Sequence, residues 1–285
     1  MPVKPLQGLV NGGQSRAVVG ALVYVFQASS SPNNRSSISL LTAATGNPRD
    51  SIGNYVLTNE QGGFSIAGDY TCTAGHQVYV YAKGGNSGGN GPNDAIGLMA
   101  SLGVCPEAGN FDSIKPFIFV NEVTTVAAAY ATADDAIDAT HISGPSVFNV
   151  ASGSVDASDL ASVATGFANS TMPNTGKRIN QSKIYTIANI LAACVNSESP
   201  TSGACITLFR YSRGNGESGA VPADTATAAL NIARNPHSNV AALFELQPRV
   251  SPPFAPSLPS APADFTLSVT PDDTTVASIS DGSQS

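Results

Sequence analysis

The run Ala21-Leu22-Val23-Tyr24-Val25-Phe26, which follows Val18-Val19-Gly20, predicts a β-strand and determines how the first third of the chain is interpreted. Its β-branched and aromatic residues favour a strand, and it is too short for a typical helix. Comparable runs, separated by Gly- or Asn-rich turns, lie at 6–10, 55–58, 63–66, 77–82 and 117–120. Many short strands joined by such turns are typical of a β-sandwich. We therefore predict a β-sandwich domain over residues 1–120, in which residues 27–53 form a long polar surface loop.

A glycine-rich stretch, Gly84-Gly85-Asn86-Ser87-Gly88-Gly89-Asn90-Gly91, follows the strand predicted at 77–82. Asn93 suits a helix N-cap and Gly103 a helix C-terminus, so we predict a helix over 94–102. A glycine-rich loop before a helix can bind phosphate. No Lys-Ser/Thr pair follows and no second βαβ half is apparent, so the stretch is interpreted as a flexible connection.

The hydrophobic period changes at Asn121, which suits an N-cap, while Glu122 suits the positive end of a helix. Apolar residues then recur at helical spacing. Further helices are predicted at 183–196 with Ser182 as the cap, from near Asp224 to Arg234 ahead of Pro236, and at 240–246. We therefore predict a mostly helical subdomain over 121–247, with a looser polar span at about 143–158.

Prolines recur between Pro248 and Pro262, which predicts a stiff, extended linker over 248–263. The following residues, Asp264-Phe265-Thr266-Leu267-Ser268-Val269-Thr270, alternate with a period of two, and a second candidate strand runs over 274–279. A lone ribbon is not stable in water, so the tail at 264–285 must pair with this chain, with another copy or with a further domain. The predicted fold class is α+β: an N-terminal β-sandwich, a mostly helical second subdomain and a C-terminal extended β tail. The side chains expected to dock are Phe265, Leu267 and Val269.

The chain has four cysteines, Cys72, Cys105, Cys194 and Cys205, and none belongs to a CxxC pair. With only three scattered histidines, the sequence predicts no metal site and no cofactor. Three disulfide pairings are possible. Cys194 and Cys205 flank a short polar loop that a disulfide can close, which favours Cys194–Cys205 and, by elimination, Cys72–Cys105. Four buried free thiols in a cytosolic protein remain the alternative.

Charged residues make up 12% of the chain, against roughly 25% in ordinary soluble domains. The net charge of −7 argues against nucleic acid as a partner, and no apolar run reaches the roughly 18 residues of a membrane span. Low charge and an even number of cysteines favour an extracellular or cell-surface location. Residues 1–5 lack the apolar segment of a signal peptide, so we expect that a signal has been removed.

Three stretches, Gly8-Leu9-Val10, residues 19–25 and Gly62-Gly63-Phe64-Ser65-Ile66, resemble the opening strands of carboxypeptidase-regulatory-like domains of the transthyretin-like and CnaB-like kind. Residues 69–72, 79–86, 121–127, 187–196 and 224–233 are similar to the N-terminal region of large secreted surface proteins of acidobacterial type. The resemblance covers about residues 6–270. It implies a secreted sandwich domain, which in that group usually precedes further modules, and it implies no particular activity.

No catalytic constellation stands out. The sequence has no Gly-x-Ser-x-Gly elbow, and His76, His141 and His237 lie in predicted surface positions. Asp134, Asp135 and Asp138 form the densest acidic group, but the calcium-binding Asp-x-Asp-x-Asp-Gly pattern is missing, so a solvated acidic face is predicted.

A CnaB-type isopeptide bond would join Lys4 or Lys115 to Asn121, with Glu122 as the buried acid. A helix start at Asn121 is the favoured interpretation of these residues. No catalytic residue is therefore predicted.

We expect a non-enzymatic extracellular structural protein, namely a surface filament or polymer subunit whose copies are joined head to tail by strand donation. The alternative is a carbohydrate- or surface-binding module of a larger secreted protein, in which the loops at 27–53 and 84–93 contact surface glycans. A hydrolase with an unrecognised site is a third possibility.

Overall fold

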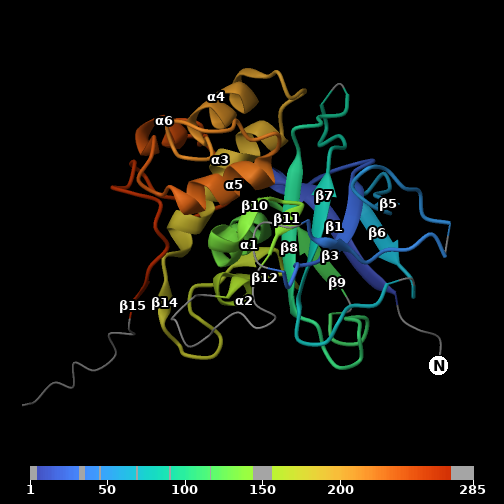
Figure 1. The fold of residues 1–285 in the computed structure, drawn as a ribbon. Coiled ribbons are helices and arrows are strands. Elements are labelled where there is room, and N and C mark those ends of the chain that lie inside the picture. Colours follow the sequence, from blue (N-terminus) through green and yellow to red (C-terminus); the bar gives the residue numbers. More distant parts are fainter. Residues whose placement is uncertain are drawn as a thin grey trace, which may run out of the picture.

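The computed structural model describes residues 5–31, 36–44, 46–68, 70–89, 91–115, 117–143 and 156–270. These residues form two larger open β-sheets, three two-stranded ribbons and six α-helices, which confirms the α+β class (Figure 1). The strands are β1 (Leu6–Gly12), β2 (Arg16–Ala17), β3 (Leu22–Gln27), β4 (Ile38–Ser39), β5 (Val56–Leu57), β6 (Gly63–Ile66), β7 (Gln77–Lys83), β8 (Gly97–Val104), β9 (Phe117–Val120), β10 (Ala136–Asp138), β11 (His141–Ile142), β12 (Ala161–Ser162), β13 (Phe167–Ala168), β14 (Arg178–Ile179) and β15 (Val269–Thr270). The helices are α1 (Glu122–Thr132), α2 (Ala157–Leu160), α3 (Gln181–Val195), α4 (Gly203–Tyr211), α5 (Thr225–Arg234) and α6 (Val240–Phe244).

The larger sheet has the strand order β4-β3-β7-β8, and β5 also pairs with β3. All its pairs are antiparallel. Both faces of its central strands are buried, and alternation along the strands separates two kinds of side chain. Aliphatic residues such as Val25 and Val80 face one way, and aromatic residues such as Tyr24 and Tyr81 face the other. Burial on both faces explains why these strands read as continuous apolar runs.

The smaller sheet is centred on β1, which pairs antiparallel with β6 and parallel with β9. Leu6, Val10 and Ile118 are fully buried, and they share one core cluster with the aliphatic face of the larger sheet. The two sheets therefore lie against each other through their aliphatic faces.

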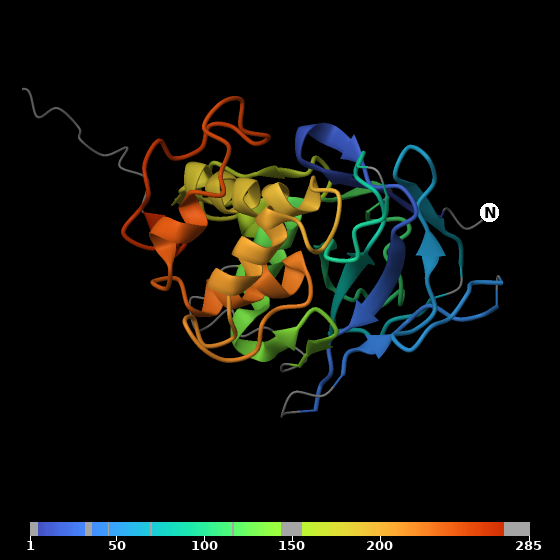
Figure 2. The same ribbon diagram turned by 90° about the horizontal axis from the view of Figure 1, so that it is seen from above.

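The helices cover the aromatic face of the larger sheet (Figure 2). Tyr24 stacks on Phe26 and Tyr81, with ring centroids 5.7 and 6.1 Å apart, and these rings share a core cluster with α1, α3 and α5. The helices and the sheet are thus built on common buried residues. The result is three layers: smaller sheet, larger sheet, helices.

The helix starts follow capping chemistry. Asn121 caps α1 in a capping box with Thr124, as predicted, and the Asp224 side chain accepts a hydrogen bond from the amide of Thr227 at the start of α5. Asn180, rather than Ser182, caps α3. Helix α4 was not predicted, because its sequence shows no strong helical period of apolar residues.

The helix predicted over 94–102 is wrong, because this segment contains strand β8. Leu98, Ala100 and Leu102 point into the aliphatic core and Met99 into the aromatic one, so the strand is apolar on both sides. Gly103, taken as a helix stop, has φ +91° beside a register shift in the β7–β8 ladder.

The proline-rich segment, predicted to be a linker, packs on the helical layer. Phe254 is buried and stacks on Tyr185 with ring centroids 6.2 Å apart. The Asn189 side chain donates to the Phe254 carbonyl (2.9 Å) and accepts from its amide (2.9 Å). One stacked pair of rings and two hydrogen bonds of the Asn189 side chain hold the segment against α3, despite its many prolines.

Phe265, expected to dock outside its own globule, is fully buried within it. Its amide donates to the Pro236 carbonyl (2.8 Å), and its carbonyl accepts from the Tyr130 hydroxyl (2.7 Å). Leu267 packs on the same core, and Val269 pairs with Ile179 in the β14–β15 ladder. Residues 264–270 are therefore part of the folded body and are not a free strand. The second candidate strand, 274–279, lies outside the described residues.

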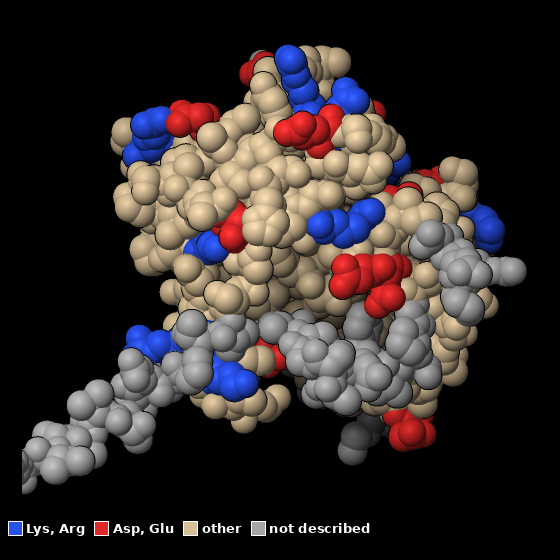
Figure 3. Space-filling model, turned by 60° about the vertical axis from the view of Figure 1, so that its left-hand side comes forward, with Lys and Arg blue, Asp and Glu red and all other residues tan. Residues whose placement is uncertain are grey.

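The molecular surface reflects the low charge of the sequence. On the face shown in Figure 3, basic and acidic side chains lie in small separate groups, and most of the area carries neither. Of the helices that the structure describes, none has the length and apolar character to cross a bilayer.

Candidate functional site

A cleft of about 480 Å³ opens beside the free edge of β8. One wall is formed by residues 101–104 of β8 and the other by residues 161–164, which include β12. Thr132, at the end of α1, and Pro173 also line it. Residues 161–164 are held next to the smaller sheet, because the amide of Phe119 in β9 donates to the Val163 carbonyl (2.7 Å).

The first half of the β8 edge is closed by threonine hydroxyls. The Gly97 amide donates to Thr225 Oγ1 (3.0 Å), and the same hydroxyl donates to the Gly97 carbonyl (2.6 Å). Two residues further, the Met99 amide donates to Thr125 Oγ1 (2.8 Å), and Thr124 Oγ1 donates to the Met99 carbonyl (2.8 Å). These hydroxyls come from the first turns of α5 and α1, and they satisfy main-chain groups that a further strand would otherwise pair.

Glycine at position 97 makes this contact possible. A Cβ added there would lie 2.5 Å from Oδ1 of Asp224, the residue that caps α5. The helix can therefore approach the strand only where no side chain stands. This close approach brings Thr225 within hydrogen-bond distance of the β8 main chain.

The second half of the β8 edge is open. In an antiparallel strand, the main-chain groups of every second residue point to the same side, so Ser101 continues the series of Gly97 and Met99. Within the described part of the chain, no group forms a hydrogen bond with the Ser101 main chain on this side, while the Ser101 hydroxyl accepts from the Gly103 amide (3.3 Å). Ser101 lines the cleft instead. The cleft therefore exposes unpaired main-chain groups of a strand that is closed elsewhere.

The cleft is polar but weakly charged. Burial lowers the pKa of Lys115, while burial, together with the nearby carboxylate of Asp159, raises the pKa of Asp156. Both shifts favour the uncharged form of the side chain, because the cleft is partly screened from water. Such surroundings suit a neutral polypeptide main chain better than a charged small molecule.

Nucleophilic chemistry in the cleft has no geometric support. A Ser–Lys catalytic pair requires a hydrogen bond between the two side chains. Among the described residues, Lys115 has no hydrogen bond to Ser101, Ser158 or Ser162, the serines of the cleft.

Both disulfides form as predicted. One includes the residue directly after β8, and the other contacts the segment directly before β8. Cys72–Cys105 joins the β6–β7 connection to the residue directly after β8, with Cα atoms 6.0 Å apart. By the chain-entropy estimate, closing this loop stabilises the fold by about 4 kcal/mol. The bond fixes the end of the strand that borders the cleft. Two disulfides are typical of proteins from oxidising compartments such as the extracellular space.

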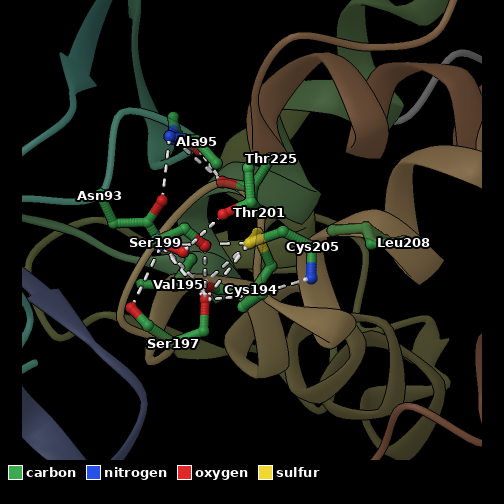
Figure 4. The surroundings of a disulfide bond; sticks show 12 residues. Asn93, Ala95, Cys194, Val195, Ser197, Ser199, Thr201, Cys205, Leu208 and Thr225 are labelled. Atoms are coloured by element: carbon green, nitrogen blue, oxygen red, sulfur yellow. Dashed lines mark hydrogen bonds between the residues drawn. A yellow bond between two sulfur atoms is a disulfide. The ribbon is translucent and has the colours of Figure 1, made fainter.

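The second disulfide, Cys194–Cys205, joins the end of α3 to α4 (Figure 4). Asn93 reaches this turn: its side chain donates to the Cys194 carbonyl (3.0 Å) and accepts from the Ala95 amide (3.1 Å). Asn93, predicted to cap a helix, therefore links the segment before β8 to the α3–α4 turn. The Thr225 amide donates to the Ala95 carbonyl (3.0 Å), so the same cross-link supports the closed half of the edge.

The residues considered for an isopeptide bond are not gathered in one place. Both ends of the Asn121 side-chain amide are occupied, since it accepts from the Thr124 amide and donates to the Gly166 carbonyl. Lys115 lines the cleft, and Lys4 lies outside the described residues.

Glu122 is fully buried, and its Oε1 accepts from the Gly13 amide (2.9 Å). Its other oxygen has no partner among the described residues. Burial raises the pKa of Glu122 to about 8, although hydrogen bonds from its own amide and that of Gly13 act in the opposite direction. Glu122 is therefore a neutral acid at the junction of α1 and the end of β1 at neutral pH.

The three histidines lie on separate elements. His141 Nδ1 is 2.9 Å from Asp138 Oδ1, and His237 Nδ1 is 3.8 Å from Asp264 Oδ2. Burial would raise the pKa of Asp138, but hydrogen bonds from His141 and Thr140 lower it overall. Within the described ranges, no three His, Cys, Asp or Glu side chains lie together as a metal ion would require.

One of the two loops considered for glycan binding, residues 84–93, borders a shallow hollow lined by Arg16, Val19, Asn86 and Gly88, among others. No aromatic side chain lines it, although sugar-binding surfaces commonly stack a ring on the sugar. Asn90 and residues 32–35 and 45 of these loops lie outside the described residues.

No family model, curated protein or solved structure matches this chain. The assignment of the cleft therefore rests on its geometry. Sequence reasoning missed the cleft because it placed a helix where β8 lies. One signal was present: β-branched hydroxyl residues, Thr124, Thr125 and Thr225, lie in the first turns after the two helix caps.

Proposed function

We propose that this protein is a non-enzymatic structural subunit of an extracellular or cell-surface assembly, and that its β8 cleft accepts an extended strand from a partner. The observation that supports this proposal is that one edge of β8 is hydrogen-bonded along its first half and open along its second half. Threonines close the edge at Gly97 and Met99, whereas the edge at Ser101 opens into a cleft.

Strand addition suits this geometry. An open edge provides main-chain donors and acceptors, and an incoming extended segment satisfies them. Four residues of β8 line the cleft, a length of about 13 Å at the usual rise per residue. Small side chains on both walls, such as Gly103, Ala161 and Ala164, leave room for a main chain between them.

An extracellular setting is consistent with the two disulfides and the low charge. Few charges also limit the repulsion between packed copies. We further propose that the two facing sheets correspond to the sandwich of carboxypeptidase-regulatory-like domains, in line with the resemblance of residues 8–10, 19–25 and 62–66 to that family. The glycan-binding alternative has weaker support, because the hollow at the 84–93 loop offers no aromatic platform among the described residues.

The proposal is tested with two variants of the same residue. Ser101→Pro removes the amide that points into the cleft, and β8 tolerates it because this amide does not pair with β7. Ser101→Ala removes the hydroxyl and keeps the amide. We expect wild type and Ser101→Ala to form dimers or larger assemblies in light scattering and negative-stain microscopy, and Ser101→Pro to stay monomeric with unchanged circular dichroism. Equal self-association of all three proteins, or none, would exclude the cleft as an assembly site.

A further inference from the structure

We propose that the strand which fills the β8 cleft is residues 274–279, Thr274-Thr275-Val276-Ala277-Ser278-Ile279, of a second copy of this chain. This inference rests on the proposed function and names the partner of the same cleft. It replaces residues 264–270 as the donor, because Phe265 is fully buried within its own chain.

The donor starts from a fixed point on the body. Phe265 and the β14–β15 ladder anchor the chain up to Thr270, which pairs with Arg178. Arg178 in turn bridges to Thr171. Fifteen residues, 271–285, follow this anchor. Fully extended, they would reach about 50 Å, several times the length of the cleft.

The sequence directly after the anchor ends the pairing of β15 with its own body. Pro271 has no amide to continue the ladder, and it restricts Thr270 to an extended conformation. We therefore assign the residues after it to the cleft of a second copy, where an unpaired strand edge can accept them.

The donor and the cleft match in composition. Residues 274–279 contain β-branched or small side chains and no charge, which suits an extended segment and a weakly charged cleft. Asp272, Asp273 and Asp281 flank this segment. Lys115 and Asp156 line the cleft, and burial shifts the pKa of each toward its uncharged form, which suits an uncharged segment.

The arrangement also favours a closed dimer over an open filament. Thr171 belongs to the short ribbon that holds the anchor, and its neighbours Asn169 and Pro173 line the cleft. The anchor of the donor therefore lies beside the cleft of its own copy. Two copies facing each other can then exchange strands reciprocally through identical contacts, as in a twofold interface.

Complementation between two full-length variants tests this inference. The donor variant carries Val276→Pro and Ala277→Pro. Because the amides of successive strand residues point to opposite edges, two adjacent prolines remove one cleft-facing amide whichever edge of the donor faces the cleft. The acceptor variant is Ser101→Pro. The control, Ser283→Pro with Gln284→Pro, places two prolines in the tail outside the proposed strand. The readout is mass by light scattering across a dilution series, together with native mass spectrometry of mixed variants.

We expect wild type and the control to dimerise, and each single-site variant to be monomeric, with a dissociation constant raised by at least about tenfold. Mixed, the two variants should form a heterodimer, because the acceptor variant still has an intact donor and the donor variant an intact cleft. If Ser101→Pro stops association while the tail prolines do not, the cleft takes another strand, so this inference fails and the proposed function stands. If neither change matters, both fail. A third outcome would overturn the second copy as partner: the wild type is monomeric, and its Ser101 amide is protected from hydrogen exchange but loses this protection in the tail variant. This outcome would show that the tail docks in the cleft of its own chain.

Discussion

Replacing Glu122 with glutamine should stabilise the fold, and the gain should depend on pH. Glu122 is fully buried, with one oxygen bonded to the Gly13 amide and the other without a described partner. Its pKa rises from 4.5 to about 8 on folding, so the folded state binds a proton that the unfolded state releases at neutral pH. Stability is then fully present below about pH 4.5 and is lost as the pH rises toward 8.

The size of the effect follows from linkage. Each pH unit between the two pKa values changes the free energy of unfolding by about 1.4 kcal/mol, so the carboxyl group costs about 3 kcal/mol at pH 7. Glutamine keeps an oxygen for the Gly13 amide and carries no proton to lose. Glu122→Gln should therefore equal the wild type near pH 4 and exceed it by about 3 kcal/mol at pH 7.

Urea unfolding between pH 4 and 8 measures this difference. Glu245→Gln is the matched control, because Glu245 is exposed and pairs with Arg249 on the surface. The control should change stability by less than about 0.5 kcal/mol with no trend between pH 5 and 8. A Glu122→Gln protein no more stable than the wild type at pH 7 would refute the reasoning, since it would show a carboxylate that is paired and charged in the folded state.

Three further changes probe the elements around the cleft, each by urea or thermal unfolding. Thr225→Val keeps the shape but leaves both main-chain groups of Gly97 without their hydroxyl, so it should cost about 1–3 kcal/mol; a neutral result would mean that water replaces the hydroxyl. Phe265→Ala empties a fully buried site and should cost about 3–5 kcal/mol, whereas a cost below about 1 kcal/mol would show that this segment detaches from its own chain. Replacing Cys72 and Cys105 by serine should cost about 4 kcal/mol, and an unchanged midpoint would contradict the role of this bond in holding the end of β8.

Much of the sheet was predictable, because strands with β-branched and aromatic alternation carry their own signal. The strands predicted at 63–66 and 117–120 match β6 and β9, and the other strands predicted within residues 1–120 differ only at their ends, whereas of the strand predicted at 264–270 only Val269–Thr270 forms. Asn121 and Asp224 were readable as helix starts because capping is local chemistry. The disulfide pairing was predictable because the short loop between Cys194 and Cys205 left one pairing by elimination.

The cleft was not predictable, because its strand is buried on both faces. Residues 97–104 show neither a strand period nor a helix period, and glycines at both ends imitate a loop and a helix stop. The threonines that close half of the edge act across more than a hundred residues in the case of Thr225, so only the fold brings them to β8. The position of Phe265 was not predictable for a related reason. The alternating residues around it predict a strand, but its side chain belongs to the buried core that contains residues of α1, α3 and α5, which lie far from it in the sequence.

Hydrogen–deuterium exchange across residues 97–104, resolved amide by amide in the wild type at high and at low protein concentration, tests the central claim most directly. The Gly97 and Met99 amides, which donate to threonines, should be protected at both concentrations. The Ser101 amide should exchange rapidly in the dilute protein and slow by at least about tenfold when copies associate, because only then does a strand cover it. Light scattering should first show that the concentrated sample is associated and the dilute sample monomeric. If the Ser101 amide then exchanges at the same rate in both samples, the β8 cleft does not accept a strand from a second copy.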